Sequence, residues 1–457
     1  MIKRFLGRVF SGRLFGPAQP KIIRFRAHGI ARESISSCAL RVTQTLQRHE
    51  FSAFVVGGAV RDLLLGGKPK DYDVATDATP EEVRTLFRRS RVIGRRFRIV
   101  HVMCGPEIVE VSTFRGANVI EGEDGRVTDE HGRILRDNVF GTQEQDATRR
   151  DFCINALFYD PATQEIWDYH DGVADLKRRR LRMIGEPEAR YREDPVRMLR
   201  AARLSASTGL EIEPRARKPI RRLAPLLANV PHARLMDELL KLLLSGHASE
   251  GVAQLRREGL LQGVLPLLDR ATAHRGAERL ITAALKATDD RVRVDKQVSP
   301  GFLFAALLWH DVVAGWKRHE EKGESPIPAL FRAMDDALKQ QAEKLPIHNR
   351  FSAYMKEIWA MQPRFLQRAG KRPYRLLELP RFRAGYDFLR LRCESGEVEA
   401  ELGDWWERFQ SASETARAQM LIQSAEPGRG RRRRRRRGRR GPGGGVKDRS
   451  PSHGTDS

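Results

Sequence analysis

The chain has 457 residues, of which 40% are hydrophobic and 31% are charged, and its formal net charge is +24. This length allows two or three domains, and the hydrophobic content excludes a largely disordered protein. The charge indicates an anionic partner, either nucleic acid or an acidic membrane surface. No apolar run approaches the ~20 residues of a membrane span, so none is expected.

The positive charge is spread along the whole chain. Residues 427–457 contain twelve Lys and Arg against two Asp, a net charge of +10, which leaves 24 − 10 = +14 for the rest. We therefore expect the folded domains, and not only the end of the chain, to meet a polyanion. The four cysteines lie far apart without metal-ligand spacing, so we predict reduced thiols and a cytoplasmic protein: Cys38, Cys104, Cys153 and Cys393.

The first predicted segment, residues 1–33, is a basic arm without regular structure. No acidic residue precedes Glu33, and the composition fits either an RNA-facing arm or a targeting segment. A small α/β head is predicted for residues 34–185. Its expected elements are helices over 34–50 and 60–65, strands over 51–56, 72–75, 98–103 and 108–113, a helix that starts at Thr79 with a capping box to Glu82, and a loop over 116–132.

The remaining sequence is predicted to be mainly helical. Residues 186–260 are expected to form a neck that recognises the nucleotide base, and residues 261–427 a body that binds RNA. Residues 428–457 include seven consecutive arginines, Arg431–Arg437, and cannot bury enough apolar surface to fold alone. The expected fold class is therefore α+β, with a disordered Arg-rich tail.

Two motifs near the start of the head suggest phosphate and metal chemistry. Gly57-Gly58 ends a predicted strand and would let backbone N–H groups approach a phosphate, although such a pair is often only a turn. Asp71 and Asp73 lie two residues apart on a strand, so both side chains share one face. Close carboxylates suit Mg²⁺, whereas the alternative is a solvated surface pair.

Three further groups of polar residues complete the candidate site. Glu110 lies in an otherwise apolar predicted strand and is the candidate third carboxylate. The alternative is a glutamate on a solvent face. The run 149–155 contains two arginines, an acid and an amide, which suit triphosphate oxygens but also an ordinary ion-pair patch. Asp194 and Arg197, three apart at a helix start, offer an acceptor and a donor to a base edge, or a simple salt bridge.

Four motifs in this order resemble the class II nucleotidyltransferases, a family of bacterial poly(A) polymerases and tRNA CCA-adding enzymes. The motifs are Val56-Gly-Gly-Ala-Val-Arg-Asp-Leu-Leu64, Asp71-Tyr-Asp73, Arg149-Arg-Asp-Phe-Cys-Ile-Asn155 and Glu193-Asp-Pro-Val-Arg-Met-Leu-Arg200. The resemblance implies a head with the polymerase-β-like fold. It also implies Mg²⁺ or Mn²⁺ as cofactor, ATP as substrate and RNA 3′ ends, of mRNA and small RNAs, as partners.

The resemblance also implies roles for single residues. Asp71 and Asp73 match the metal ligands, and together with Glu110 and Asp151 they match the catalytic acids. The positions that match nucleotide-binding residues are Gly57, Gly58, Arg61, Asp62, Arg149, Arg150, Asn155, Asp194, Arg197 and Arg200. Two metal ions would promote attack of the RNA 3′-OH on the α-phosphate and stabilise pyrophosphate.

Within the family, the sequence resembles the poly(A) polymerase branch. The supporting stretches are Ile93-Gly-Arg-Arg-Phe-Arg-Ile-Val-His-Val102, Gly370-Lys-Arg-Pro-Tyr-Arg-Leu-Leu377 and Phe382-Arg-Ala-Gly-Tyr-Asp-Phe-Leu389. The implied function is template-independent addition of AMP to RNA 3′ ends in mRNA polyadenylation and turnover. The alternatives are a CCA-adding enzyme and a non-catalytic RNA-binding protein on the same scaffold.

Two other sequence features are predicted to be structural. Trp405-Trp406 can stack bases, but helix packing is the favoured interpretation. His310-Asp311 resembles part of a metal phosphohydrolase site, yet a convincing set of further ligands is missing from the sequence.

Overall fold

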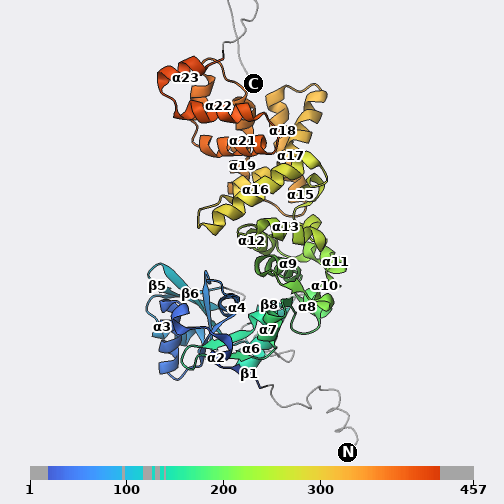
Figure 1. Ribbon diagram of the computed structural model, residues 1–457. Helices are drawn as coiled ribbons and strands as arrows, with labels where there is room; N and C mark the ends of the chain where they lie inside the picture. The colour runs from blue at the N-terminus through green and yellow to red at the C-terminus, as the bar shows by residue number, and fades with distance from the viewer. Residues whose placement is uncertain (1–18, 95–97, 117–125, 129–133, 138–139, 423–457) are drawn as a thin grey trace, which may run out of the picture.

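The computed structural model describes residues 19–94, 98–116, 126–128, 134–137 and 140–422. An α+β head, a helical neck and a helical body follow one another in an elongated molecule (Figure 1). This order confirms the predicted fold class, while the predicted tail, residues 428–457, lies outside the described residues. In this part of the chain, no helix combines the length and apolar character needed to cross a membrane.

The head is built on one eight-stranded sheet with the order β1-β10-β9-β2-β3-β6-β5-β4. Neighbouring strands are antiparallel except for β3 and β6, which are parallel. The strands are β1 (Lys21–Ile23), β2 (Ala53–Val56), β3 (Tyr72–Thr76), β4 (Ser90–Ile93), β5 (Ile99–Cys104), β6 (Glu107–Thr113), β9 (Leu157–Asp160) and β10 (Glu165–Asp168). Three further helices and one small strand pair belong to the head: α2 (Phe25–His28), α4 (Gly58–Leu64), α7 (Gly172–Lys177), and β7 (Arg126–Thr128) with β8 (Ile134–Asp137). A second small pair joins β11 (Arg180–Leu181) of the head to β12 (Glu211–Ile212), which follows the first neck helices in the sequence.

The two faces of this sheet are covered differently. Helices α3 (Ser37–Arg48) and α5 (Pro80–Leu86) bury one face, against alternate apolar residues of β3, β5 and β6. On the other face, α6 (Gln143–Arg149) and the short helix η2 (Cys153–Asn155) contribute to a second apolar cluster with β2 and β9. Strand β2 is therefore buried on both faces, which explains its continuous apolar run.

Local signals in the sequence set several of these elements. The predicted capping box of α5 is confirmed, because Thr79 accepts from the Glu82 N–H while the Glu82 side chain accepts from Thr79. A second capping box, between Thr142 and Gln145, starts α6. Both boxes satisfy backbone donors that a helix leaves unpaired in its first turn.

Three predictions for the head are wrong in part. Residues 19–33 are ordered, since β1 pairs with β10, so the predicted arm does not extend to residue 33. Residues 126–128 of the predicted loop form a strand paired with residues 134–137. Cys38 of α3 and Cys104 of β5 form a disulfide rather than two thiols, because packing of α3 against the sheet brings them together.

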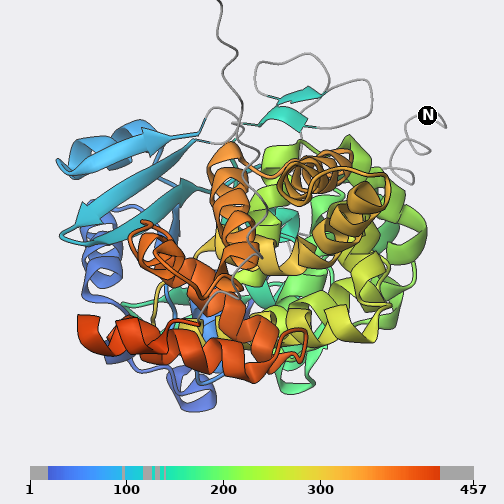
Figure 2. The same cartoon turned by 90° about the horizontal axis from the view of Figure 1, so that it is seen from above.

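The neck begins with α8 (Pro187–Glu193) and α9 (Val196–Thr208), and α9 packs with α12 (His232–Leu243) and α13 (Ala248–Arg257). The short helices α10 (Pro214–Arg217) and α11 (Ile220–Leu223) lie between α9 and α12 in the sequence, and α14 (Leu261–Val264) and α15 (Pro266–Ala271) follow α13. The body contains α16 (Arg275–Arg293), α17 (Pro300–Glu321), α18 (Pro326–Ala342), α19 (Asn349–Phe365), α20 (Arg372–Leu377), α21 (Phe382–Glu394), α22 (Ala400–Ser411) and α23 (Glu414–Met420). Figure 2 shows these helices from above.

The two features predicted to be structural lie in the body. Trp405 and Trp406 are buried in an aromatic cluster, where Trp406 donates to the Phe365 carbonyl, so the packing interpretation is confirmed. The Asp311 carboxylate faces Arg270 at 3.5 Å, and the His310 ring stacks on His274 at 4.7 Å.

Candidate functional site

A cleft of about 1480 Å³ lies between the head and the neck. It is lined by all the catalytic and nucleotide-binding residues predicted from the sequence. Further lining comes from α9 and α12, including Arg203, Arg234, Glu238 and Lys241. One cavity therefore collects charged side chains from both parts of the chain.

Three acidic residues meet where β3 and β6 run side by side. Asp73 of β3 lies directly opposite Glu110 of β6, and Asp71 precedes β3 by one residue. The side chain of Asp73 is open to the cleft but surrounded by protein. This surrounding protein raises the pKa of Asp73 to about 6, and the negative charges of Glu110 and Asp71 add to the effect. The strand register therefore places Asp73 beside Glu110, with Asp71 two residues before Asp73.

Glu110 has a further neighbour on its outer side. His101 of β5 lies opposite Glu110 in the antiparallel pair, and its Nε2 is 3.2 Å from a Glu110 carboxylate oxygen. Asp73, Glu110 and His101 thus form one row across three strands. Side chains in such a row share a sheet face.

The glycine pair follows β2 and begins α4. Gly57 has φ of +71° and ψ of −125°, a conformation that is available essentially to glycine. A Cβ atom there would lie 3.3 Å from the Arg150 guanidinium and 3.7 Å from the Asn155 carbonyl oxygen. The backbone conformation therefore requires glycine at this turn, and a side chain would also press on the Arg150 guanidinium.

Two arginines beside the glycine pair are held by side-chain and backbone acceptors. Arg61 donates to the Asn155 side-chain oxygen at 2.8 Å and to Asp62 at 2.8 Å. Arg150 donates two hydrogen bonds to one carboxylate oxygen of Asp146, at 3.1 and 2.9 Å. These contacts fix the positions of both guanidinium groups at the cleft wall.

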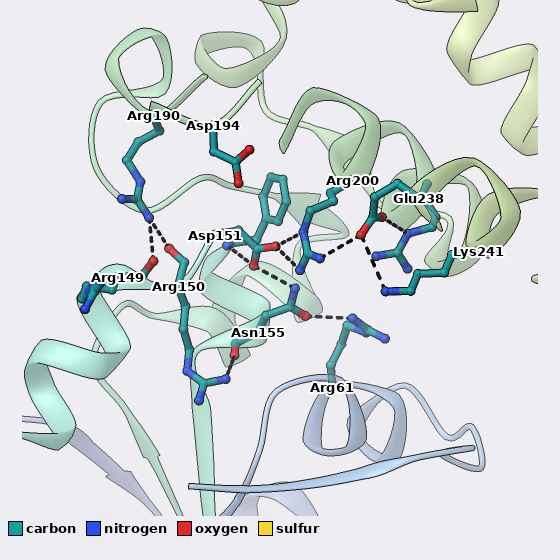
Figure 3. A network of polar contacts seen from close by, with 12 residues as sticks. Arg61, Arg149, Arg150, Asp151, Asn155, Arg190, Asp194, Arg200, Glu238 and Lys241 are labelled. Carbon is teal, nitrogen blue, oxygen red and sulfur yellow. Dashed lines mark hydrogen bonds and ion pairs between the residues drawn. The ribbon is translucent and has the colours of Figure 1, made fainter. Parts of the chain in front are cut away.

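Asp151 is saturated by donors from the protein (Figure 3). One carboxylate oxygen accepts from the Phe152 N–H at 2.8 Å and from the Asn155 amide at 3.1 Å. The other accepts from two nitrogens of Arg200, at 2.7 and 2.6 Å. Burial acts to raise the pKa of Asp151, but Arg200, Asn155 and the Phe152 N–H together hold that pKa below its ordinary value.

The same network continues into the neck. Arg200 of α9 also contacts Glu238 of α12 at 3.2 Å, and Arg203 donates to the other Glu238 oxygen at 3.0 Å. Glu238 is buried, and the Asp151 and Glu238 charges raise the pKa of Arg200 further. Asp151, Arg200 and Glu238 therefore link the head to two neck helices through buried charges (Figure 3).

Asp194 and Arg197 do not pair through their side chains in the described contacts. Asp194 ends α8, and its two carboxylate oxygens accept from Arg234 of α12 at 3.1 and 2.8 Å. Arg197 donates to Glu193 at 2.8 Å and to the Arg190 carbonyl at 2.9 Å. The predicted acceptor and donor both line the cleft, but neighbouring side chains hold each of them.

The sequence analysis missed the contribution of α12. Its residues Arg234, Glu238 and Lys241 line the cleft, and their spacing of four and three residues places them on one face of a helix. Such a charged stripe on an otherwise leucine-rich helix was a usable signal. Glu238 was the stronger one, because a glutamate among buried leucines requires cationic partners.

Family models match three parts of the chain. Residues 53–182 match "Poly A polymerase head domain", and residues 209–272 match "Probable RNA and SrmB-binding site of polymerase A". Residues 322–440 match "Polymerase A arginine-rich C-terminus".

Whole-chain comparisons give the same picture. The chain is 46% identical to a poly(A) polymerase I of Salmonella typhi over 410 residues, which cover 88% of each chain. It is 45% identical to a poly(A) polymerase I of Escherichia coli O6:H1 over 422 residues, which cover 89% of this chain and 90% of the relative. A solved Bacillus stearothermophilus CCA-adding enzyme in complex with CTP is 25% identical with a TM-score of 0.54, and the match covers 81% of this chain and 80% of that one.

Proposed function

This chain belongs to the poly(A) polymerase family, and on that basis we propose that it adds AMP from ATP to RNA 3′ ends, without a template and with release of pyrophosphate. The observation that supports this most directly is the meeting of Asp71, Asp73 and Glu110 beside the Gly57-Gly58 turn, in one cleft. The implied partners are ATP and RNA, in agreement with the +14 charge outside the tail.

We propose that Asp71 and Asp73 hold Mg²⁺ or Mn²⁺. The fit is supported by the raised pKa of Asp73, since crowded carboxylates are stabilised by a bound cation. Among the described residues no three His, Cys, Asp or Glu are arranged to hold a metal, so the proposal leaves the remaining positions to water and substrate phosphates. The metal would lower the pKa of the RNA 3′-OH and stabilise pyrophosphate.

The chain's own residues would bind and orient the triphosphate. Gly57 and Gly58 leave backbone room for phosphate oxygens, and Arg61 with Arg150 presents fixed guanidinium groups at the same wall. Further proposed contacts come from residues that line the cleft around them, namely Asp62, Arg149, Asn155 and Arg200. We propose that Asp194 and Arg197 contact the nucleotide base. Arg234 holds the Asp194 carboxylate in position, and Glu193 holds the Arg197 guanidinium.

Asp151 was predicted to be a catalytic acid, and its contacts favour a different role. Its carboxylate oxygens are already occupied by Arg200, Asn155 and a backbone N–H. We therefore propose that Asp151 is a positioning residue, which orients Asn155 and Arg200 at the cleft. Glu110, with its side chain open to the cleft, remains the proposed third catalytic carboxylate.

The main alternative is CCA addition to tRNA by the same chemistry. Identity to the named poly(A) polymerases over most of the chain favours AMP addition. We also propose that the reaction takes place in the cytoplasm, where RNA and ATP meet.

The test is to offer the purified protein each of the four nucleoside triphosphates with Mg²⁺, on oligo(A) and on a tRNA lacking CCA. We expect a long ATP-dependent tract on oligo(A) and little CTP incorporation. Asp73→Ala should abolish addition while leaving RNA affinity within about twofold, because the carboxylate acts in chemistry rather than in RNA binding. Efficient CTP addition to the tRNA would favour the alternative, and substantial activity of Asp73→Ala would refute the metal assignment.

A further inference from the structure

Among the described residues, the sheet face that carries the proposed catalytic carboxylates is open at β4, β5 and β6. The helices in close contact with these three strands are α3 and α5, and both lie on the opposite face. On the open face, apolar side chains stand in solvent: Ile108 is 48% exposed, Met103 is 39% exposed and Ile93 is 37% exposed. Ile108 and Met103 lie opposite each other on β6 and β5, whereas Ile93 lies on the other side of the Glu110–His101 pair. The exposed apolar pair Ile108 and Met103, next to the proposed catalytic carboxylates, indicates a binding surface.

The strand register shows which residues of this surface lie next to the carboxylates. One row of opposed residues crosses four strands: Asp73 of β3, Glu110 of β6, His101 of β5 and Arg91 of β4. The neighbouring row pairs Ile108 with Met103. The first row therefore changes from acidic at β3 and β6, through His101 at β5, to the exposed cation Arg91 at β4, and the apolar pair lies beside it.

The geometry of in-line phosphoryl transfer indicates which ligand this face binds. In the proposed function, the triphosphate lies by the Gly57-Gly58 turn, which follows β2, on one side of Asp73. In-line transfer requires the attacking 3′-OH to approach from the side opposite the leaving pyrophosphate. Since β2 and β6 flank β3 on its two sides, the RNA must approach over β6 and the strands beyond it.

We propose that the open face of β6, β5 and β4 seats the last nucleotides of the RNA primer, with Ile108 and Met103 against the bases or sugars and Arg91 on a backbone phosphate. Apolar contacts and a phosphate contact do not depend on base identity, so they can bind a primer whose last nucleotide changes with each addition. In Figure 1, β5 and β6 lie at the side of the head away from α6 and α7. This proposal rests on the proposed function, because the in-line argument needs the triphosphate at the glycine turn.

Two variants of the full-length protein, each with a matched control, test the proposal. Ile108→Ser is compared with Ile22→Ser, which changes a 42% exposed isoleucine on β1 at the far edge of the same sheet. Arg91→Ser is compared with Arg41→Ser, an exposed arginine on α3 across the sheet. We expect KM for a short oligo(A) primer to rise about tenfold in the first member of each pair, with kcat and KM for ATP within about twofold. Both controls should match the wild type.

A photo-crosslinking nucleotide at the primer's last position provides a second measurement. We expect adducts within residues 98–113, which include β5 and β6. An unchanged primer KM in both variants, or adducts only in the neck and body, would overturn the proposal. Equal changes in variants and controls would overturn it too, because the effect would then lie in sheet stability. Absence of AMP addition by the wild type would instead refute the proposed function itself.

Discussion

Asp73 combines a functional position with a local cost to stability. Its carboxyl is surrounded by protein and faces two like charges, and its pKa is raised to about 6, above the ~4 of an unfolded chain. A raised carboxyl pKa means that the folded state holds the proton more tightly. In the absence of metal, the ionised group therefore destabilises the fold. This cost is fully present above pH 6 and is lost as the pH falls from 6 towards ~4.

We expect Asp73→Asn to be inactive yet more stable than the wild type at pH 7.5 without metal. The gain should be about 1 kcal/mol, because solvent access to the carboxyl screens part of the repulsion. Thermal unfolding in EDTA between pH 5 and 8 measures it. The difference should shrink below pH 6, and Mg²⁺ should stabilise the wild type alone. Equal stability at every pH would mean that the like charges are relaxed by solvent.

At the residue scale, the sequence best predicts the relative positions of residues that lie close together on one strand. Alternation placed Asp71 and Asp73 on one face, and Glu110 is in fact directly opposite Asp73. The sequence predicts least well which side chains on separate elements contact each other. Asp151 was predicted to be a catalytic acid, because nothing in its own motif indicates that Arg200, 49 residues away, donates to one of its carboxylate oxygens.

Among the elements, α9 and α12 depend on each other through Glu238. This buried carboxylate accepts from Arg200 and Arg203 and lies 3.8 Å from the Lys241 ammonium group. Removing it takes the Glu238 acceptor from Arg203 and leaves Arg200 with Asp151. Removal of one partner of a buried ion pair usually costs about 3 kcal/mol or more. Without Glu238, the packing of α9 against α12 should therefore weaken, and so should the contact between Arg200 and Asp151 of the head.

We predict that Glu238→Ala lowers the free energy of unfolding by about 3 kcal/mol and raises KM for ATP, because Arg200 loses one of its two carboxylate partners. Glu238→Gln should fall between the variant and the wild type, since it keeps an acceptor oxygen. Hydrogen exchange should show lost protection in α9 and α12. Glu250→Ala, at an exposed site on the adjacent α13, serves as control and should stay within about 0.5 kcal/mol. Unchanged exchange in Glu238→Ala would refute the coupling.

Elements were predictable where their signals are local. The Thr79 capping box and the apolar run of β2 needed only neighbouring residues. Strand β1 was missed because its segment is rich in cations, and only pairing with β10, more than 140 residues later, makes it a strand. The Cys38–Cys104 disulfide, with a sequence separation of 66, likewise depends on how α3 packs on the sheet.

At the scale of the whole molecule, the chain is strongly basic. The part of the chain before residue 427 has a net charge of +14, and the tail adds +10. A positive net charge attracts RNA to the protein, while in the proposed function the carboxylates of Asp73 on β3 and Glu110 on β6 lie where its 3′ end reacts.

Deleting residues 428–457 removes twelve basic and two acidic residues. Binding of single-stranded RNA should weaken at low salt, because each neutralised phosphate adds ~0.7 to the slope of log affinity against log salt, and contacts from about half of these cations would lower that slope by ~4. At high salt the truncated and full-length proteins should converge, and kcat on a saturating primer should persist. A replacement tail with the same residues in scrambled order should restore affinity, whereas a Gly/Ser tail of equal length should not. Failure of the scrambled tail would show that the arrangement of the arginines matters, and not only their charge.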